Sequence, residues 1–203
     1  MSRSSEIPNL TIEEYLKFEE TSELRHEYIA GQIFAMSSAT EGHNVICVNL
    51  LALLHAHLSG TGCRVFTNDM KVKIEAASSF YYPDIMVTCE PLDAKSVFKK
   101  SPVLIAEVLS PSTKHIDRRE KLIAYRHLMS LNEYVILHQD RYRIEVYRKD
   151  PQGKWHGMLF GKNDVVSLIS MPSGTLDIPV STIYEPLIFE TLVEEEGEEY
   201  GAG

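Results

Sequence analysis

Residues 82–87, YPDIMV, and residues 103–110, VLIAEVLS, are the two stretches on which the interpretation of the fold depends. Both are apolar enough to be buried strands, and each carries one carboxylate, Asp84 or Glu107. An isolated ionised group in such a place is costly unless it is paired or bound to a metal ion. Strand alternation puts Glu107 on the same face as Ile105 and Leu109, so its side chain is expected to point into one packed layer.

The hydrophobic periodicity of the rest of the chain predicts an α/β protein. A capping box formed by Thr11 and Glu14 starts the first expected helix. The expected helices cover residues 12–20, 41–58 and 114–129, with one further turn near 180–184. The expected strands cover residues 28–36 (two strands turned at Gly31), 63–66, 70–75, 83–88, 102–109, 133–137 and 142–148, with shorter strands after Pro151. The strands at 63–66, 70–75, 83–88 and 102–109 are expected to form the core of the sheet.

Length and composition favour one globular domain. The chain has 203 residues, of which 44% are hydrophobic and 24% charged, which excludes a disordered or fibrous protein. No apolar run approaches the roughly 20 residues that span a bilayer, and no signal-peptide pattern is visible, so a cytoplasmic protein without membrane contact is expected. We expect a flexible N-terminus at 1–9, a single folded domain at 10–190 and an acidic, disordered tail at 191–203.

The distribution of charge along the chain is compatible with a nucleic-acid partner, although the net charge is -9. Five glutamates lie in the last ten residues, while the segment from Lys95 to Arg126 carries an excess of positive charge. This excess is consistent with a basic face that contacts phosphates. A solvated surface of mixed charges is the alternative.

Three cysteines, Cys47, Cys63 and Cys89, lack the spacing of a zinc site or a redox motif. We expect them to be reduced thiols in the core. His43 lies near the start of its helix, where a capping or packing role is favoured over a catalytic one.

The two strand carboxylates predict a cation site. If the strands are neighbours, Asp84 and Glu107 face each other and repel by about 4 kcal/mol at an effective dielectric constant of about 20. A divalent cation turns this repulsion into affinity, and oxygen ligands suit Mg²⁺ or Mn²⁺. Such a cation next to a phosphate is the arrangement used for phosphodiester cleavage.

These residues resemble a known family. Pro83-Asp84, the segment from Glu107 to Thr113, and Asp117, Lys121 and Tyr125 ahead of Glu133-Tyr134 resemble the Uma2 (Uma-two) family of bacterial restriction endonucleases, within the PD-(D/E)-x-K nuclease superfamily. The resemblance covers roughly residues 10 to 185. It implies a restriction-endonuclease-like core, with a central mixed β-sheet flanked by helices and additional C-terminal strands. It also implies a Mg²⁺-dependent (or Mn²⁺-dependent) endonuclease in which Asp84 and Glu107 are catalytic metal ligands and Glu27 is a further one.

The sequence departs from the superfamily pattern at one position. The lysine expected two residues after the second acidic residue is replaced by Leu109. The resemblance implies that Lys121 on the following helix takes this role, with Lys71 or Lys73 as the fallback. Two alternatives without a catalytic role stay open. Lys121 could be a solvated helix residue, and Glu27 could pair with neighbouring basic side chains on the surface.

The expected function is metal-dependent hydrolysis of DNA. Lys121 would supply positive charge to the scissile phosphate or the attacking water, and Lys114, Arg118 and Arg119 would hold flanking phosphates. Cutting both strands favours a homodimer. The alternatives are an inactive nuclease-fold protein that binds nucleic acid or protein, and a structural protein in which Asp84 and Glu107 accept hydrogen bonds from backbone amides.

Overall fold

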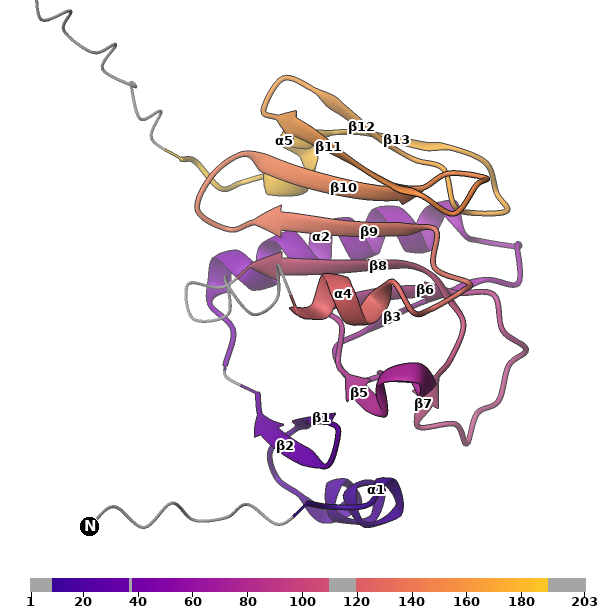
Figure 1. The fold of residues 1–203 in the computed structure, drawn as a ribbon. Helices are drawn as coiled ribbons and strands as arrows, with labels where there is room; N and C mark the ends of the chain where they lie inside the picture. Colours follow the sequence, from indigo (N-terminus) through magenta and orange to yellow (C-terminus); the bar gives the residue numbers. More distant parts are fainter. Residues whose placement is uncertain (1–8, 37, 110–119, 190–203) are drawn as a thin grey trace, which may run out of the picture.

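The computed structural model describes residues 9–36, 38–109 and 120–189 (Figure 1). The described helices are α1 (Ile12–Thr21), α2 (Glu41–His57), the short 3₁₀ helix η1 (Glu75–Ala77), α4 (Leu122–Tyr125) and α5 (Val180–Tyr184). The described strands are β1 (His26–Ile29), β2 (Gln32–Ala35), β3 (Arg64–Thr67), β4 (Lys71–Ile74), β5 (Ser79–Tyr81), β6 (Ile85–Thr88), β7 (Phe98–Lys99), β8 (Pro102–Leu109), β9 (Glu133–His138), β10 (Arg143–Lys149), β11 (Trp155–Gly161), β12 (Val165–Leu168) and β13 (Leu176–Pro179). The expected flexible N-terminus and acidic tail lie outside these residues, apart from Asn9.

A six-stranded mixed sheet forms the centre of the protein, in the order β11-β10-β9-β8-β6-β3. Strands β8 and β9 run parallel, and the other neighbours run antiparallel. Helix α2 covers one face of this sheet and α4 lies on the other (Figure 1). The predicted mixed sheet flanked by helices, with additional C-terminal strands, is therefore confirmed.

The alternation of β8 explains the two packed layers. Leu104, Ala106 and Val108 pack in a core that includes the apolar residues of α2. Ile105 and Leu109 belong to the opposite core, with the aromatic residues of α4 and β9. Glu107 shares this second face, as the sequence predicts, and there it meets the helix that follows β8.

A second, smaller sheet has the order β2-β1-β5-β4-β7. Helix α1 packs against it through Tyr15, whose ring stacks on Tyr28 and contacts Phe80. Residues 70–75 were predicted to lie in the same sheet as the strands at 63–66, 83–88 and 102–109. This was wrong, since β4 pairs with β5 and β7 instead. Periodicity identifies a strand but carries no information on its partner.

The helix predicted at 114–129 ends earlier than expected. Of this range the structure describes residues 120–129, and α4 stops at Tyr125. The amides of His127 and Leu128 donate to carbonyls three residues back, which tightens the last turn and ends the helix. This turn buries Leu128 and leaves Met129 exposed.

The prediction of three reduced cysteines was wrong for two of them. Strands β3 and β6 are antiparallel neighbours with Arg64 opposite Thr88, so Cys63 and Cys89 come together just beyond that pair. Their Cα atoms are 4.1 Å apart and the two residues form a disulfide. Cys47 is the free cysteine.

Of the helices in the described residues, none combines the length and apolar character needed to cross a bilayer.

The central core predicts the effect of a cavity. Leu104 is fully buried, so Leu104→Ala should lower the free energy of unfolding by about 2–5 kcal/mol. Leu92 is 72% exposed, so Leu92→Ala should change it by less than about 0.5 kcal/mol. Urea unfolding followed by circular dichroism measures both, and equal unfolding midpoints for the two variants would contradict this packing.

Candidate active site

Glu107 is the centre of a buried polar cluster between the central sheet and α4. Its carboxylate oxygen Oε1 accepts a hydrogen bond from the Tyr125 hydroxyl at 2.7 Å and lies 3.3 Å from the Lys121 ammonium. Its other oxygen, Oε2, accepts from the backbone amide of Asp84 at 3.4 Å. The side chain is almost completely buried. A charge in this position requires compensation, which Lys121 supplies.

Lys121 lies between two carboxylates. Its Nζ is 3.0 Å from Glu27 Oε1, on β1, and 3.3 Å from Glu107 Oε1, on β8. The ammonium is buried and also lies 5.9 Å from the centre of the Tyr81 ring. The predicted residues Glu27, Glu107 and Lys121 are thus brought together, with Glu27 next to Lys121.

The fallback lysines lie elsewhere. Lys71 Nζ donates to the Tyr82 hydroxyl, and Lys73 Nζ contacts Glu75. Leu109, at the position where the superfamily pattern has lysine, is buried in the apolar core beside α4. Lys121 is therefore the lysine, among those described, that contacts Glu107.

Asp84 lies just before β6, and the strand register brings it to Glu107. Ile85 pairs with Ala106, so the preceding residue Asp84 comes opposite Glu107. Asp84 Oδ2 accepts from the amide of Val108 at 2.8 Å and lies 3.1 Å from His43 Nε2. The contact between the two acidic residues is from the Asp84 amide to the Glu107 carboxylate. The strands β6 and β8 are therefore neighbours in the sheet, as the sequence predicts.

Two residues of α2 extend the cluster beyond what the sequence analysis predicted. His43 contacts Asp84, and its Nδ1 lies 3.6 Å from the Cys47 Sγ. Burial, followed by the nearby carboxylates of Asp84 and Glu107, raises the pKa of the Cys47 thiol. A protonated thiol donates to Nδ1, which leaves Nε2–H to donate to Asp84.

The expected capping role falls to a different residue. Thr40 caps α2 by accepting from the His43 amide, so the His43 side chain is free to reach Asp84. The signal that was available in the sequence is the spacing of His43 and Cys47, four residues apart on one side of a helix.

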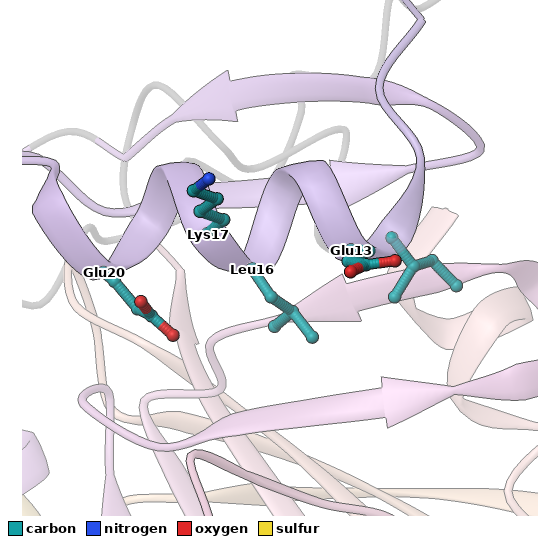
Figure 2. A pocket seen from close by; sticks show the side chains of 5 residues that line it. Glu13, Leu16, Lys17 and Glu20 are labelled. Atoms are coloured by element: carbon teal, nitrogen blue, oxygen red, sulfur yellow. The ribbon is translucent and has the colours of Figure 1, made fainter.

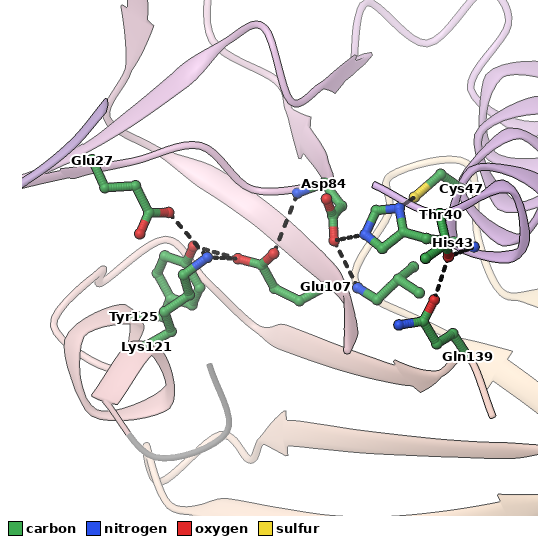
Figure 3. Close-up of polar contacts among 10 residues, drawn as sticks. Glu27, Thr40, His43, Cys47, Asp84, Glu107, Lys121, Tyr125 and Gln139 are labelled. Carbon is green, nitrogen blue, oxygen red and sulfur yellow. Dashed lines mark hydrogen bonds and ion pairs between the residues drawn. The ribbon is translucent and has the colours of Figure 1, made fainter. Parts of the chain in front are cut away.

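The polar groups form a row from one sheet to α2 (Figure 3). The row runs from Glu27 through Lys121 and Glu107 to Asp84, and then to His43 and Cys47. Its described members include three carboxylates but one ammonium group. This donor set, with hard carboxylate oxygens on Asp84 and Glu107, fits a divalent cation such as Mg²⁺ or Mn²⁺.

Burial and the neighbouring Glu107 carboxylate keep Tyr125 protonated. Burial, and next the Glu107 carboxylate, raise the pKa of Tyr125 well above its ordinary value of about 10. The hydroxyl therefore stays protonated and keeps donating to Glu107, which orients that carboxylate.

Other predicted or visible features lie apart from this cluster. Lys114, Arg118 and Arg119, predicted to contact phosphates, fall outside the described residues, as does Asp117. Figure 2 shows a depression along α1, and its lining contains none of the predicted site residues. The lining consists of Ile12, Glu13, Leu16, Lys17 and Glu20.

Comparison with known proteins finds a matching family model and similar sequences. Residues 12–180 match the model of the Uma2 family, described as "Putative restriction endonuclease". The protein slr1290 of Synechocystis sp. is 38% identical over 189 residues, which cover 93% of this chain and 98% of the relative. A second Synechocystis protein, sll1609, is 36% identical over 149 residues, covering 72% of this chain and 84% of the relative. Both are named as uncharacterized proteins.

A solved structure shares the fold. The crystal structure of "a putative nuclease belonging to DUF820" from Anabaena variabilis superposes with a TM-score of 0.71. The match covers 86% of this chain and 97% of that chain, at 19% sequence identity.

The raised pKa of Tyr125 predicts a pH dependence of stability. Above about pH 10 the unfolded chain loses tyrosine protons that the folded protein keeps, so the free energy of unfolding falls as pH rises. Each such tyrosine contributes a slope of about 1.4 kcal/mol per pH unit. Tyr125→Phe should make the fall shallower by about this amount, as measured by urea unfolding from about pH 9 to about pH 11.

Tyr125→Phe should also lower the free energy of unfolding by an amount that does not depend on tyrosine ionisation. At neutral pH, Tyr125→Phe should cost about 1.5–3 kcal/mol, because the buried Glu107 carboxylate loses a hydrogen bond. If the slope above pH 10 equals that of the parent protein, Tyr125 is not the group that stays protonated.

Proposed function

Because this chain belongs to the Uma2 family of putative restriction endonucleases, we propose that it is a metal-dependent endonuclease that hydrolyses DNA phosphodiester bonds. One observation carries the proposal. The Glu107 carboxylate on β8 accepts from the backbone amide of Asp84, just before the neighbouring strand β6, and contacts the ammonium group of Lys121, just before α4. Asp84, Glu107 and Lys121 are the catalytic residues of this proposal.

Asp84 and Glu107 would hold a Mg²⁺ or Mn²⁺ ion. When bound, the cation lowers the pKa of a water molecule and offsets the negative charge that develops at the phosphorus centre. Glu27 is proposed to assist, either as a further ligand or through Lys121, with which it forms an ion pair. The position of Asp84 opposite Glu107 on neighbouring strands supports a cation here.

Lys121 is proposed to take the role of the lysine that Leu109 replaces. A lysine on β8 would reach the site from the strand, whereas Lys121 reaches Glu107 from the start of α4. Its ammonium group would stabilise charge on the scissile phosphate or orient the attacking water. Burial strengthens this effect, because the local dielectric constant is lower than that of water.

Two side chains and one backbone amide position the carboxylates. Tyr125 holds Glu107 Oε1, and His43 together with the Val108 amide holds Asp84 Oδ2. A carboxylate that already has one oxygen fixed loses less freedom when the other binds a ligand.

The wider setting of the enzyme is also part of the proposal. Cleavage of both strands of a duplex calls for two active sites related by two-fold symmetry, so we propose a homodimer. Lys114, Arg118 and Arg119 are proposed to contact the phosphates that flank the cleaved bond, and the cytoplasm is the proposed location. Binding of nucleic acid or protein without catalysis is the competing function, favoured by the burial of Leu109 at the usual lysine position.

The first test removes each carboxylate charge. Asp84→Asn and Glu107→Gln should each lower Mg²⁺-dependent nicking of supercoiled plasmid DNA by at least about 100-fold, because each loses an anionic metal ligand. Glu13→Gln is the matched control, since Glu13 is exposed on α1 and should be replaceable without effect. Unchanged nicking by Asp84→Asn would refute the mechanism, and DNA binding by the parent protein without metal-dependent cleavage would establish the competing function.

The second test separates the role of Lys121 from metal binding. Lys121→Met should lower the cleavage rate by roughly 100- to 1,000-fold. It should retain or tighten Mn²⁺ binding, measured by electron paramagnetic resonance, because a positive charge next to Glu107 is removed. Loss of Mn²⁺ binding with the fold intact, or full activity, would contradict the assigned role.

A further inference from the structure

We propose that His43, Cys47 and Asp84 form a second cation site, selective for a thiophilic divalent ion such as Zn²⁺ or Co²⁺. One ligand atom from each of the three residues lies within 4.8 Å of the other two. Two of them come from α2, and the third comes from the residue just before β6 (Figure 3). Asp84 is shared with the proposed Mg²⁺ site, so the two sites are adjacent.

The donor types determine which ion fits. A cysteine sulfur and an imidazole nitrogen are ligands that Zn²⁺ and Co²⁺ prefer, whereas Mg²⁺ takes oxygen ligands. Three protein ligands with one position left for water or an anion is the usual composition of an open zinc site. The second site therefore differs in selectivity from the pair of carboxylates beside it.

The fold brings the three side chains together, with the His43 ring between the other two: its Nδ1 faces Cys47 and its Nε2 faces Asp84. His43 and Cys47 are one helical turn apart, and their Nδ1 and Sγ atoms are 3.6 Å apart. Asp84 is fixed by the Val108 amide of the neighbouring strand. The side chains of His43 and Asp84 are 10% and 13% exposed, so the group is shielded but remains accessible to solvent.

Ion binding exchanges protons for the metal. The Cys47 thiol releases its proton to solvent, and a bond from sulfur to the metal takes its place. The His43 ring turns so that Nε2 faces both Cys47 and Asp84, and the proton of Nε2 moves to Nδ1. The hydrogen bond between His43 and Asp84 is exchanged for bonds from both residues to the ion. No oxidant or other reactant is needed.

Sharing Asp84 has a functional consequence. An ion held by His43 and Cys47 withdraws Asp84 from the Mg²⁺ site, so a thiophilic ion should inhibit cleavage. This consequence rests on the proposed function, whereas the binding itself does not.

Cobalt spectroscopy on the full chain tests the binding directly. With the disulfide between Cys63 and Cys89 intact, Cys47 is the free thiol of the chain. Titration with Co²⁺ should give a near-ultraviolet thiolate-to-cobalt charge-transfer band that saturates at one ion per chain. The band should be lost in Cys47→Ser and retained in His55→Gln, which removes an exposed imidazole from the same helix.

Each outcome of the cobalt titration either supports or overturns the second site. Absence of the band in the folded parent protein, or its persistence in Cys47→Ser, overturns the proposal. If serine destabilises this position, as circular dichroism would show, Cys47→Ala and His43→Gln provide the same test. Zn²⁺ should displace Co²⁺ and remove the band.

Inhibition is measured separately from binding. The Zn²⁺ concentration that halves Mg²⁺-dependent nicking, relative to the zinc-free rate of the same variant, should rise at least tenfold in Cys47→Ser. A cobalt band in a protein without nuclease activity would refute the proposed function and leave the second site standing. Nuclease activity without the band would refute the second site and leave the proposed function standing.

Discussion

The buried ammonium group of Lys121, placed between the carboxylates of Glu27 and Glu107, is the interaction on which the site depends. Glu27 belongs to the small sheet, Glu107 to the central sheet, and Lys121 immediately precedes α4, so three parts of the fold meet at one charge. Such groups are costly to bury singly, and removing one partner leaves an uncompensated charge. The site is thereby assembled by the same contacts that bring these elements together.

Asp84 is the second constraint, because it links the two sides of the central sheet. Its amide donates to Glu107, which faces α4, while its carboxylate accepts from His43, which belongs to α2 on the opposite face. A single residue at the start of β6 therefore takes part in a cluster of hard oxygen donors and in a cluster with imidazole and sulfur. The proposed competition between two classes of cation follows from this position.

Much of the site could be predicted because it depends on short-range patterns. The alternation of β8 assigns Glu107 to one face, and the position of Asp84 at the start of a strand is visible in its neighbours. The placement of Lys121 came from the family resemblance and not from spacing. His43 was interpreted as a capping or packing residue from its place near the start of a helix. Its contact with Asp84 joins residues 41 positions apart in the sequence, so no local pattern reveals it. The Cys63–Cys89 disulfide was missed for the same reason: it depends on the pairing of β3 with β6.

By itself, the sequence determined the class of the fold, most of its helices and strands, the face that Glu107 occupies and the spacing of His43 and Cys47 on one helix. These properties follow from backbone geometry that repeats every two or 3.6 residues, so a local window contains them. The tertiary structure alone decided which strands share a sheet, which carboxylate oxygen meets Lys121 and that Asp84 faces a histidine. Those contacts join residues far apart in the chain, and their energies depend on burial that exists only after the layers have packed.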